Sequence, residues 1–204
     1  MRELMKPTPL HEIVGNTDIY LLDQIMKEKY RKSDTILDAG CGGGRNLFWF
    51  LKNEIDIYGV DNDATAINYI KSNYPNLDRK KFIVAEIDNL PFDINFFDHL
   101  ISSAVLHFAK STSHFKNMMK EMTRVLKPNG SLFIRMTSNI GIENKVRLVK
   151  NGVYDIPDSS TRFLLTPTLL NNLLVENNLS LAEPLKTVNV DNLRCMSTLV
   201  LIKN

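Results

Sequence analysis

Near the start of this chain, an apolar run ends at an aspartate and passes directly into a turn that is dense in glycine. The run is Ile36-Leu37-Asp38-Ala39, and glycine occupies positions 40, 42, 43 and 44. Glycine has no Cβ, so such a turn can adopt positive φ and lie close against a ligand. Apolar residues at 47, 48, 50 and 51 predict a helix that begins at the turn and points its first N–H groups into the same place. This order of elements predicts a nucleotide-type cofactor site at the end of a first strand.

The spacing of the glycines separates two kinds of nucleotide site. The dinucleotide fingerprint is G-x-G-x-x-G, and counting from Gly40 puts its third glycine at position 45, where this chain has Arg45. The chain instead has the pattern D-x-G-x-G-x-G from Asp38 to Gly44. A dehydrogenase is therefore disfavoured.

Alternating strand-like and helical segments predict the fold. Apolar segments with strand character occur at 35–39, 55–61, 81–85, 97–103, 131–136, 179–190 and 195–202. Helical spacing occurs between most of them, at 19–26, 45–53, 64–74, 115–126 and, after Thr166-Pro167, at 169–174. We therefore expect an α/β fold with a doubly wound, mostly parallel seven-stranded sheet and an antiparallel C-terminal strand.

The length of 204 residues predicts a single domain, 1–204, with four parts. Residues 1–33 form an N-terminal arm, irregular over 1–16, and a helix. Residues 34–137 form the cofactor-binding core. The long connection 138–165 follows the fifth strand at the carboxyl edge, so we expect it to be a lid that holds the substrate. Residues 166–204 form a C-terminal helix and strand pair.

Charge and cysteine content exclude some classes of protein. The chain has 25 basic and 23 acidic residues, and the lysines are scattered rather than gathered into a stripe for nucleic acid. Its two cysteines, Cys41 and Cys195, lack ligand spacing, so neither a metal site nor a disulfide is expected. No segment has the length or composition of a membrane span or secretory signal, and we expect a cytoplasmic protein.

Four segments, in order, resemble those of the class I S-adenosylmethionine-dependent methyltransferases. The D-x-G-x-G-x-G pattern resembles their motif I, and Val84–Phe92 resembles their third segment. Asn95–His107 resembles their fourth strand, and Arg124–Gly130, reading R-V-L-K-P-N-G, resembles the approach to their fifth. The resemblance covers about residues 16 to 137. It implies the Rossmann-like methyltransferase fold and S-adenosyl-L-methionine as cofactor, with S-adenosyl-L-homocysteine as product.

The resemblance implies roles for residues around the glycine turn. Asp38 fixes the loop and orients the amino-acid end of the cofactor, or alternatively only accepts hydrogen bonds from loop amides. Gly40 and Gly42, with Cys41 between them, allow the backbone to approach the cofactor. The main-chain carbonyl of Ser103, or that of its neighbour at 104, faces the same ammonium group.

The acids after the second and third strands are candidates for binding the nucleoside. Asp61 stands 21 residues after Gly40, where a carboxylate can accept hydrogen bonds from ribose hydroxyls. Its alternative role is an N-cap, for which Asp63 is at least as well placed. By the resemblance, Glu86 accepts the adenine amine, with Asp88 as the alternative, and Ile87 offers a backbone N–H. Asn62 completes the predicted site.

Candidate groups for the methyl acceptor follow the fourth and fifth strands. A sulfonium methyl is already electrophilic, so the main task of the protein is to align a nucleophile behind it. His107 is the candidate general base, with packing or gating as the alternative. Arg135 and Arg162 are candidates for anchoring an anionic substrate, with a surface role as the alternative.

The function that we expect is methyl transfer to an N, O, S or metalloid atom of a small molecule, by a monomer or homodimer. Nucleic-acid amino methylation typically uses an Asn/Asp-Pro-Pro-aromatic motif after the fourth strand, and this chain has Ser103-Ala104-Val105-Leu106. An aminopropyl transferase is disfavoured because Ser102 and Ser103 provide no acid for a polyamine. Two alternatives stay open: a non-catalytic cofactor-binding or interaction module, and a nucleic-acid or protein methyltransferase.

Overall fold

The computed structural model describes residues 8–74 and 77–204. The first seven residues of the predicted arm, together with 75 and 76, lie outside the described residues. The predicted arm contains one short helix, α1 (Leu10–Val14), where an irregular segment was expected. Among the described residues, no helix is both long enough and apolar enough to span a membrane.

A mixed sheet forms the centre of the molecule, in the strand order β10-β11-β5-β4-β1-β2-β3, with β9 also on β11. The strands from β3 to β5 are parallel to one another, whereas β11 is antiparallel to β5. This confirms the predicted mostly parallel, doubly wound sheet with an antiparallel C-terminal strand. The strands are β1 (Thr35–Ala39), β2 (Asp56–Asp61), β3 (Phe82–Val84), β4 (Phe97–Ser103), β5 (Leu126–Ser138), β9 (Leu179–Leu181), β10 (Lys186–Val190) and β11 (Arg194–Lys203).

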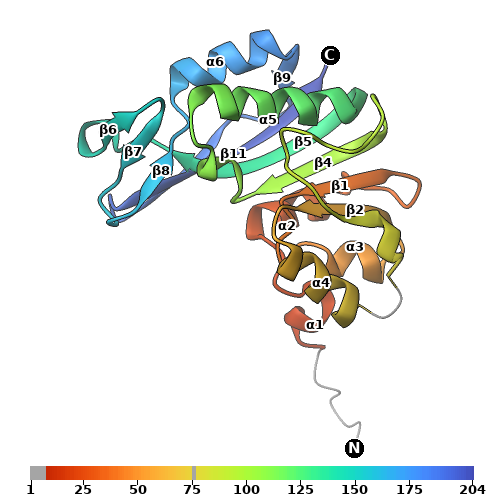
Figure 1. The fold of residues 1–204 in the computed structure, drawn as a ribbon. Coiled ribbons are helices and arrows are strands. Elements are labelled where there is room, and N and C mark those ends of the chain that lie inside the picture. Colours follow the sequence, from red (N-terminus) through yellow and green to blue (C-terminus); the bar gives the residue numbers. More distant parts are fainter. Residues whose placement is uncertain (1–7, 75–76) are drawn as a thin grey trace, which may run out of the picture.

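Helices cover both faces of this sheet (Figure 1). One face carries α2 (Ile19–Met26), α3 (Phe48–Lys52) and α4 (Ala64–Asn73), and the other carries α5 (Thr112–Val125) and α6 (Pro167–Glu176). In β1, Ile36 packs toward the first group and Leu37 toward the second, because successive strand residues point to opposite faces. The sheet is therefore buried on both sides.

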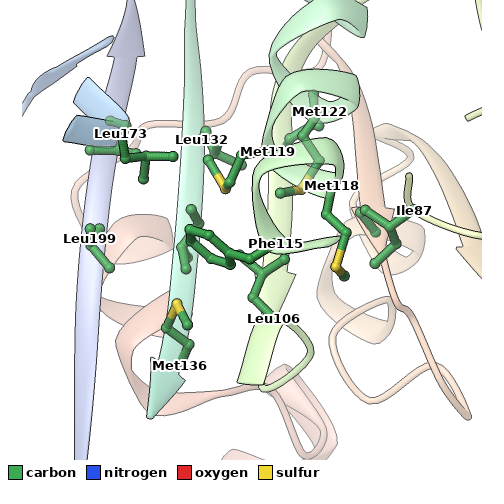
Figure 2. Packing of buried hydrophobic residues seen from close by; sticks show 14 of the residues in the cluster. Ile87, Leu106, Phe115, Met118, Met119, Met122, Leu132, Met136, Leu173 and Leu199 are labelled. Carbon is green, nitrogen blue, oxygen red and sulfur yellow. The ribbon is translucent and has the colours of Figure 1, made fainter. Parts of the chain in front are cut away.

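The packing on the α5 face follows the helical spacing of its apolar residues. Phe115, Met118, Met119 and Met122 are all buried, and they recur three and four residues apart along one side of α5. Figure 2 shows Phe115 and Met119 on the side of α5 that faces Leu132 of β5, with Leu199 of β11 beyond it, whereas Met118 points toward Ile87. This interface packs α5 along the face of β4 and β5.

Two elements differ from the prediction. The single strand expected over 179–190 is two strands, so the sheet has eight strands among the described residues instead of seven. Both pieces pair with β11 and are separated around Pro184, which has no N–H for a ladder hydrogen bond. The helix expected over 45–53 is shorter and consists of α3 (Phe48–Lys52) alone, since residues 42–47 form turns.

The long connection between β5 and α6 is itself structured. It forms a three-stranded antiparallel sheet of β6 (Arg147–Lys150), β7 (Val153–Asp155) and β8 (Thr161–Phe163), preceded by a short 3₁₀ turn at Glu143–Lys145. Phe163 stacks on Phe115 of α5, with ring centroids 4.9 Å apart. Figure 1 shows this small sheet beside the carboxyl ends of β4 and β5. Its role as a lid stays a prediction.

Candidate active site

The glycine loop is attached to the second strand through its backbone. The N–H groups of Gly40 and Cys41 both donate to the Val60 carbonyl, at 2.8 and 2.9 Å. Gly40 has φ +84°, and a Cβ on it would lie 2.4 Å from Cγ2 of Val105. Only glycine fits this position, because both the backbone conformation and the neighbouring side chain exclude a methyl group.

Asp61, at the end of β2, holds the loop from the other side. Its Oδ2 accepts a hydrogen bond from Gly42 N at 2.8 Å, and its Oδ1 accepts one from Asp63 N at 2.9 Å. The N-cap of α4 is Asp63, whose carboxylate accepts from Thr65 N. The capping role considered for Asp61 therefore belongs to Asp63.

Asp38 is placed differently from either expectation about its hydrogen bonds. Its side chain is 1% exposed, and neither carboxylate oxygen has a hydrogen-bond partner in the described part of the chain. Among the residues that the structure describes, the hydrogen bonds to the glycine loop that were expected of Asp38 are absent, because Asp61 accepts from Gly42 instead. The role of Asp38 in orienting the amino-acid end of the cofactor stays a prediction. Burial raises the pKa of Asp38 to about 7; the nearby Arg45 opposes this shift and Asp61 adds to it.

A cavity of about 580 Å³ opens at the carboxyl ends of the strands. Eight predicted cofactor residues line it: Gly40, Cys41, Gly42, Asp61, Asn62, Glu86, Ile87 and Ser103. Burial raises the pKa of the Cys41 thiol, so this residue is a small uncharged wall of the cavity. Asp38 is not among the lining residues.

The end of the cavity beyond β3 combines an acid with an apolar wall. Asn62 Nδ2 lies 3.3 Å from both carboxylate oxygens of Glu86, which is exposed to solvent. Next to it, the buried Ile87 faces Met118 of α5 (Figure 2), and both residues line the cavity. Such an apolar wall beside a carboxylate suits a flat ring that carries an amino group.

The neighbouring acid Asp88 interacts with α5 instead. Its Oδ2 lies 3.6 Å from Nε2 of His114, whose Nδ1 accepts a hydrogen bond from the backbone N–H of Lys110. His114 and Lys110 both line the cavity. Asp88 therefore connects the third segment to the start of α5.

Asp18 connects several elements of the fold at the opposite end of the cavity. Its carboxylate, 2% exposed, lies 2.9 Å from Nη1 of Arg135 and 3.6 Å from Nη2 of Arg45. It also accepts a hydrogen bond from the hydroxyl of Ser103 at 3.2 Å, and it caps α2 by accepting from Tyr20 N. One buried carboxylate thus fixes the start of α2, the end of β4 and two arginines.

The three residues predicted for the acceptor lie beside the cavity and do not line it. His107 is 8% exposed, in the 3₁₀ turn Leu106–Phe108, and its ring packs on Phe108. Arg135 is held by Asp18, with its guanidinium 5.0 Å from the centre of the Tyr20 ring. Arg162 lies over the ring of Phe108, 5.2 Å from its centre.

Several residues of the site were not predicted from the sequence. Asp18 had a detectable signal, since an aspartate directly before an apolar helical repeat is a typical N-cap. No sequence pattern indicated its long-range partners, Arg45, Ser103 and Arg135. The lining residues that were not predicted as site residues include Arg45, Asn46, Phe108, Lys110, His114 and Met118.

These features together define a class of protein. The sheet order, the glycine loop after β1, the acid at the end of β2 and the antiparallel strand beyond β5 are those of a class I S-adenosylmethionine-dependent methyltransferase fold. The cavity fits that cofactor, because a Cβ at Gly42 would meet no atom within 4 Å, so the loop leaves room for a ligand there. Asp61, Glu86 and Ile87 would hold its nucleoside.

Comparison with known proteins shows which family this region resembles. Residues 37–134 match the family model described as a methyltransferase domain. This part of the chain is therefore similar to known methyltransferase domains. A crystal structure of an S-adenosylmethionine-dependent methyltransferase from Methanosarcina mazei superposes with a TM-score of 0.72, over 88% of this chain and 96% of that one, at 19% identity.

Two curated relatives match the same region. An uncharacterized methyltransferase of Bacillus subtilis, YodH, is 34% identical over 53% of this chain and 42% of its own length. The tRNA (carboxymethyluridine(34)-5-O)-methyltransferase of Arabidopsis thaliana is 33% identical over 52% of this chain and 25% of its own length. The chain thus spans less than half the length of these relatives.

Proposed function

We propose that this protein transfers a methyl group from S-adenosyl-L-methionine to an N, O, S or metalloid atom of a small molecule. The observation that carries the proposal is the cavity bounded by the glycine loop and by the carboxylates of Asp61 and Glu86. Two acids at the ends of adjacent parallel strands suit the ribose hydroxyls and the adenine amine. When bound, the cofactor supplies an electrophilic methyl group on a sulfonium centre.

In the proposed reaction, the protein acts mainly by positioning. Burial, together with the neighbouring Arg162, Arg194 and Arg135, lowers the pKa of His107 to about 4, so its imidazole is neutral near pH 7. A neutral imidazole has the protonation state of a base, but His107 does not line the cavity. We therefore assign His107 a packing role beneath Phe108. The rate of methyl transfer then depends on how well the acceptor is aligned with the methyl group.

Charge balance favours a small acceptor over a nucleic acid. The segment 138–165, which borders the open end of the site, contains four basic residues, Lys145, Arg147, Lys150 and Arg162, and three acidic ones, Glu143, Asp155 and Asp158. A polyanionic substrate is held by many phosphate contacts, which such a balanced surface does not provide. The Arabidopsis relative acts on tRNA, so a tRNA acceptor is the alternative that the experiments address.

Calorimetric titration with S-adenosylmethionine, S-adenosylhomocysteine and NAD tests the cofactor site. We expect the first two to bind and NAD not to bind. Asp61→Ala should weaken binding more than tenfold, since it loses the contact to Gly42 and the ribose acceptor. Asp63→Ala is the matched control, because it removes only the helix cap and should leave affinity within twofold. Binding of NAD alone would overturn the proposal.

The acceptor class is tested with methyl-labelled cofactor. Purified protein is incubated either with bulk tRNA or with a small-molecule extract passed through a 3 kDa filter. Label in a product of low mass supports the proposal. Label in tRNA alone would overturn the small-molecule assignment and favour the alternative.

A further inference from the structure

Four guanidinium groups belong to the region beyond β4 and β5: Arg45 lines the cavity, and Arg135, Arg162 and Arg194 lie outside its lining. They share two carboxylates: Arg45 and Arg135 lie on Asp18, and Arg194 lies 3.6 Å from Asp158, in the turn that leads to Arg162. Four positive and two negative charges leave an excess of two positive charges at this end. The acids Asp61 and Glu86 lie at the opposite end, so the charge is separated along the cavity.

His107 is a buried polar group of this region. Its Nδ1 has no hydrogen-bond partner among residues 8–74 and 77–204, although the side chain is more than nine-tenths buried. Burial and then Arg162, Arg194 and Arg135 lower its pKa, so these three cations lie close enough to act on one imidazole. Nε of Arg135 is also buried without a partner. Two buried nitrogen atoms without a hydrogen-bond partner within the described residues, one of them the Nε–H donor of Arg135, lie near several cations and indicate a place for an anion.

Phe108 connects this charged region to the cavity. Its ring lines the cavity and is 62% exposed, while the guanidinium of Arg162 lies 5.2 Å from its centre. A flat group that packs on Phe108 would therefore lie next to the guanidinium of Arg162. A guanidinium can donate two parallel hydrogen bonds to a planar anion such as a carboxylate.

We propose that the methyl acceptor carries a carboxylate, held by Arg162 and Arg194 beside Phe108. This inference rests on the proposed function and names the substrate class of that site. Arg135 is held more closely than Arg194: its Nη1 donates a hydrogen bond to Asp18 at 2.9 Å, whereas Arg194 lies 3.6 Å from Asp158. Its part is to fix the end of β5, and the two arginines of the small sheet and of β11 contact the ligand.

Benzoate and its uncharged amide, benzamide, are matched probes for this site. Each is titrated by calorimetry into protein saturated with S-adenosylhomocysteine. We expect benzoate to bind at least tenfold more tightly than benzamide, and Arg162→Gln or Arg194→Gln to remove that preference. Arg147→Gln is the control, since Arg147 belongs to the same small sheet but pairs with Asp155 and is 83% exposed. It should keep the preference.

A second readout is the imidazole signal of His107 in an NMR pH titration. A bound carboxylate offsets the field of the arginines, so benzoate should raise the pKa of His107 and benzamide should leave it unchanged. Inorganic phosphate is the third probe; binding as tight as that of benzoate would indicate a general anion site and overturn the assignment to a carboxylate.

The outcomes separate this inference from the proposed function. Loss of the benzoate preference in Arg147→Gln as large as in Arg162→Gln, or no preference in the unmodified protein, overturns the inference alone if S-adenosylhomocysteine still binds. Failure of S-adenosylhomocysteine to bind to the unmodified protein overturns the proposed function. Arg162→Gln should leave the affinity for S-adenosylhomocysteine within twofold, which also shows that the variant is folded.

Discussion

The two ends of the cavity bind by different chemistry. The end formed by β1, β2 and β3 offers backbone N–H groups and carboxylates, with Asp61 closing the loop through Gly42. The end beyond β4 and β5 has arginines beside it, two of which, Arg45 and Arg135, are fixed by the buried Asp18. The first end depends on a backbone shape that only glycine allows. The second depends on side chains that come from distant parts of the chain and neutralise one another only in part.

The largest expected effect is at the glycine loop. Gly40→Ala should lower the free energy of unfolding by about 4 kcal/mol, because it adds a methyl group against Val105 at positive φ. Gly43→Ala is the control, since its Cβ would lie 3.8 Å from the nearest atom, on Tyr69, and it should cost less than about 1 kcal/mol. Urea denaturation measures both. Equal losses would show that the loop shape does not depend on Gly40.

Asp38 should make the ligand-free protein less stable as pH rises. Its pKa is raised from 3.8 to about 7, so the folded state keeps a proton that the unfolded chain releases. This proton contributes about 4 kcal/mol to the free energy of unfolding. The contribution is complete below pH 3.8 and is lost as pH rises to 7. Asp38→Asn removes this dependence, which urea denaturation between pH 4 and 8 would measure. An unchanged pH profile in the variant contradicts the buried, protonated carboxyl group.

Breaking the arginine-holding carboxylate tests the other end. Asp18→Ala should cost about 3 kcal/mol, because it leaves Arg135 partly buried without its ion pair. Asp23→Ala removes a carboxylate of α2 that also pairs with two cations, Lys27 and Lys186, but is 39% exposed. It should cost less than about 1 kcal/mol. Similar losses in thermal or urea unfolding would mean that the burial of Asp18 does not matter.

His107 should have the opposite pH dependence to Asp38. Its pKa is lowered from 6.5 to about 4, so between these pH values the imidazole is protonated in the unfolded chain and neutral in the folded protein. The contribution is present above pH 6.5 and is lost as pH falls to 4, by about 3 kcal/mol. The two groups therefore offset one another in the unmodified protein. His107→Asn should lose less of its free energy of unfolding in acid than the unmodified protein, as measured by urea denaturation between pH 4 and 7. An equal loss in both proteins would refute the assignment.

The cofactor end was largely predictable because its parts are short and local. The strand, the glycine turn and Asp61 are identified by spacing alone, and the parallel sheet brings successive strand ends to one edge. The hydrogen-bond roles of Asp38 and Asp61 were not predictable in this way. Which carboxylate reaches Gly42 depends on the register of β1 against β2 and on how deeply each side chain is buried.

The amino-acid sequence by itself determined the order of strands and helices, the apolar face of α5 and the position of the glycine turn, because each follows from residue type and periodicity along the chain. Only the tertiary structure decided that Asp18 meets Arg135, 117 positions away, and that Arg162 lies over Phe108. Side-chain charges carry no directional signal in sequence. Their partners are set by the folding of β5, β8 and α2 against one another, and so the acceptor end is a property of the packed molecule.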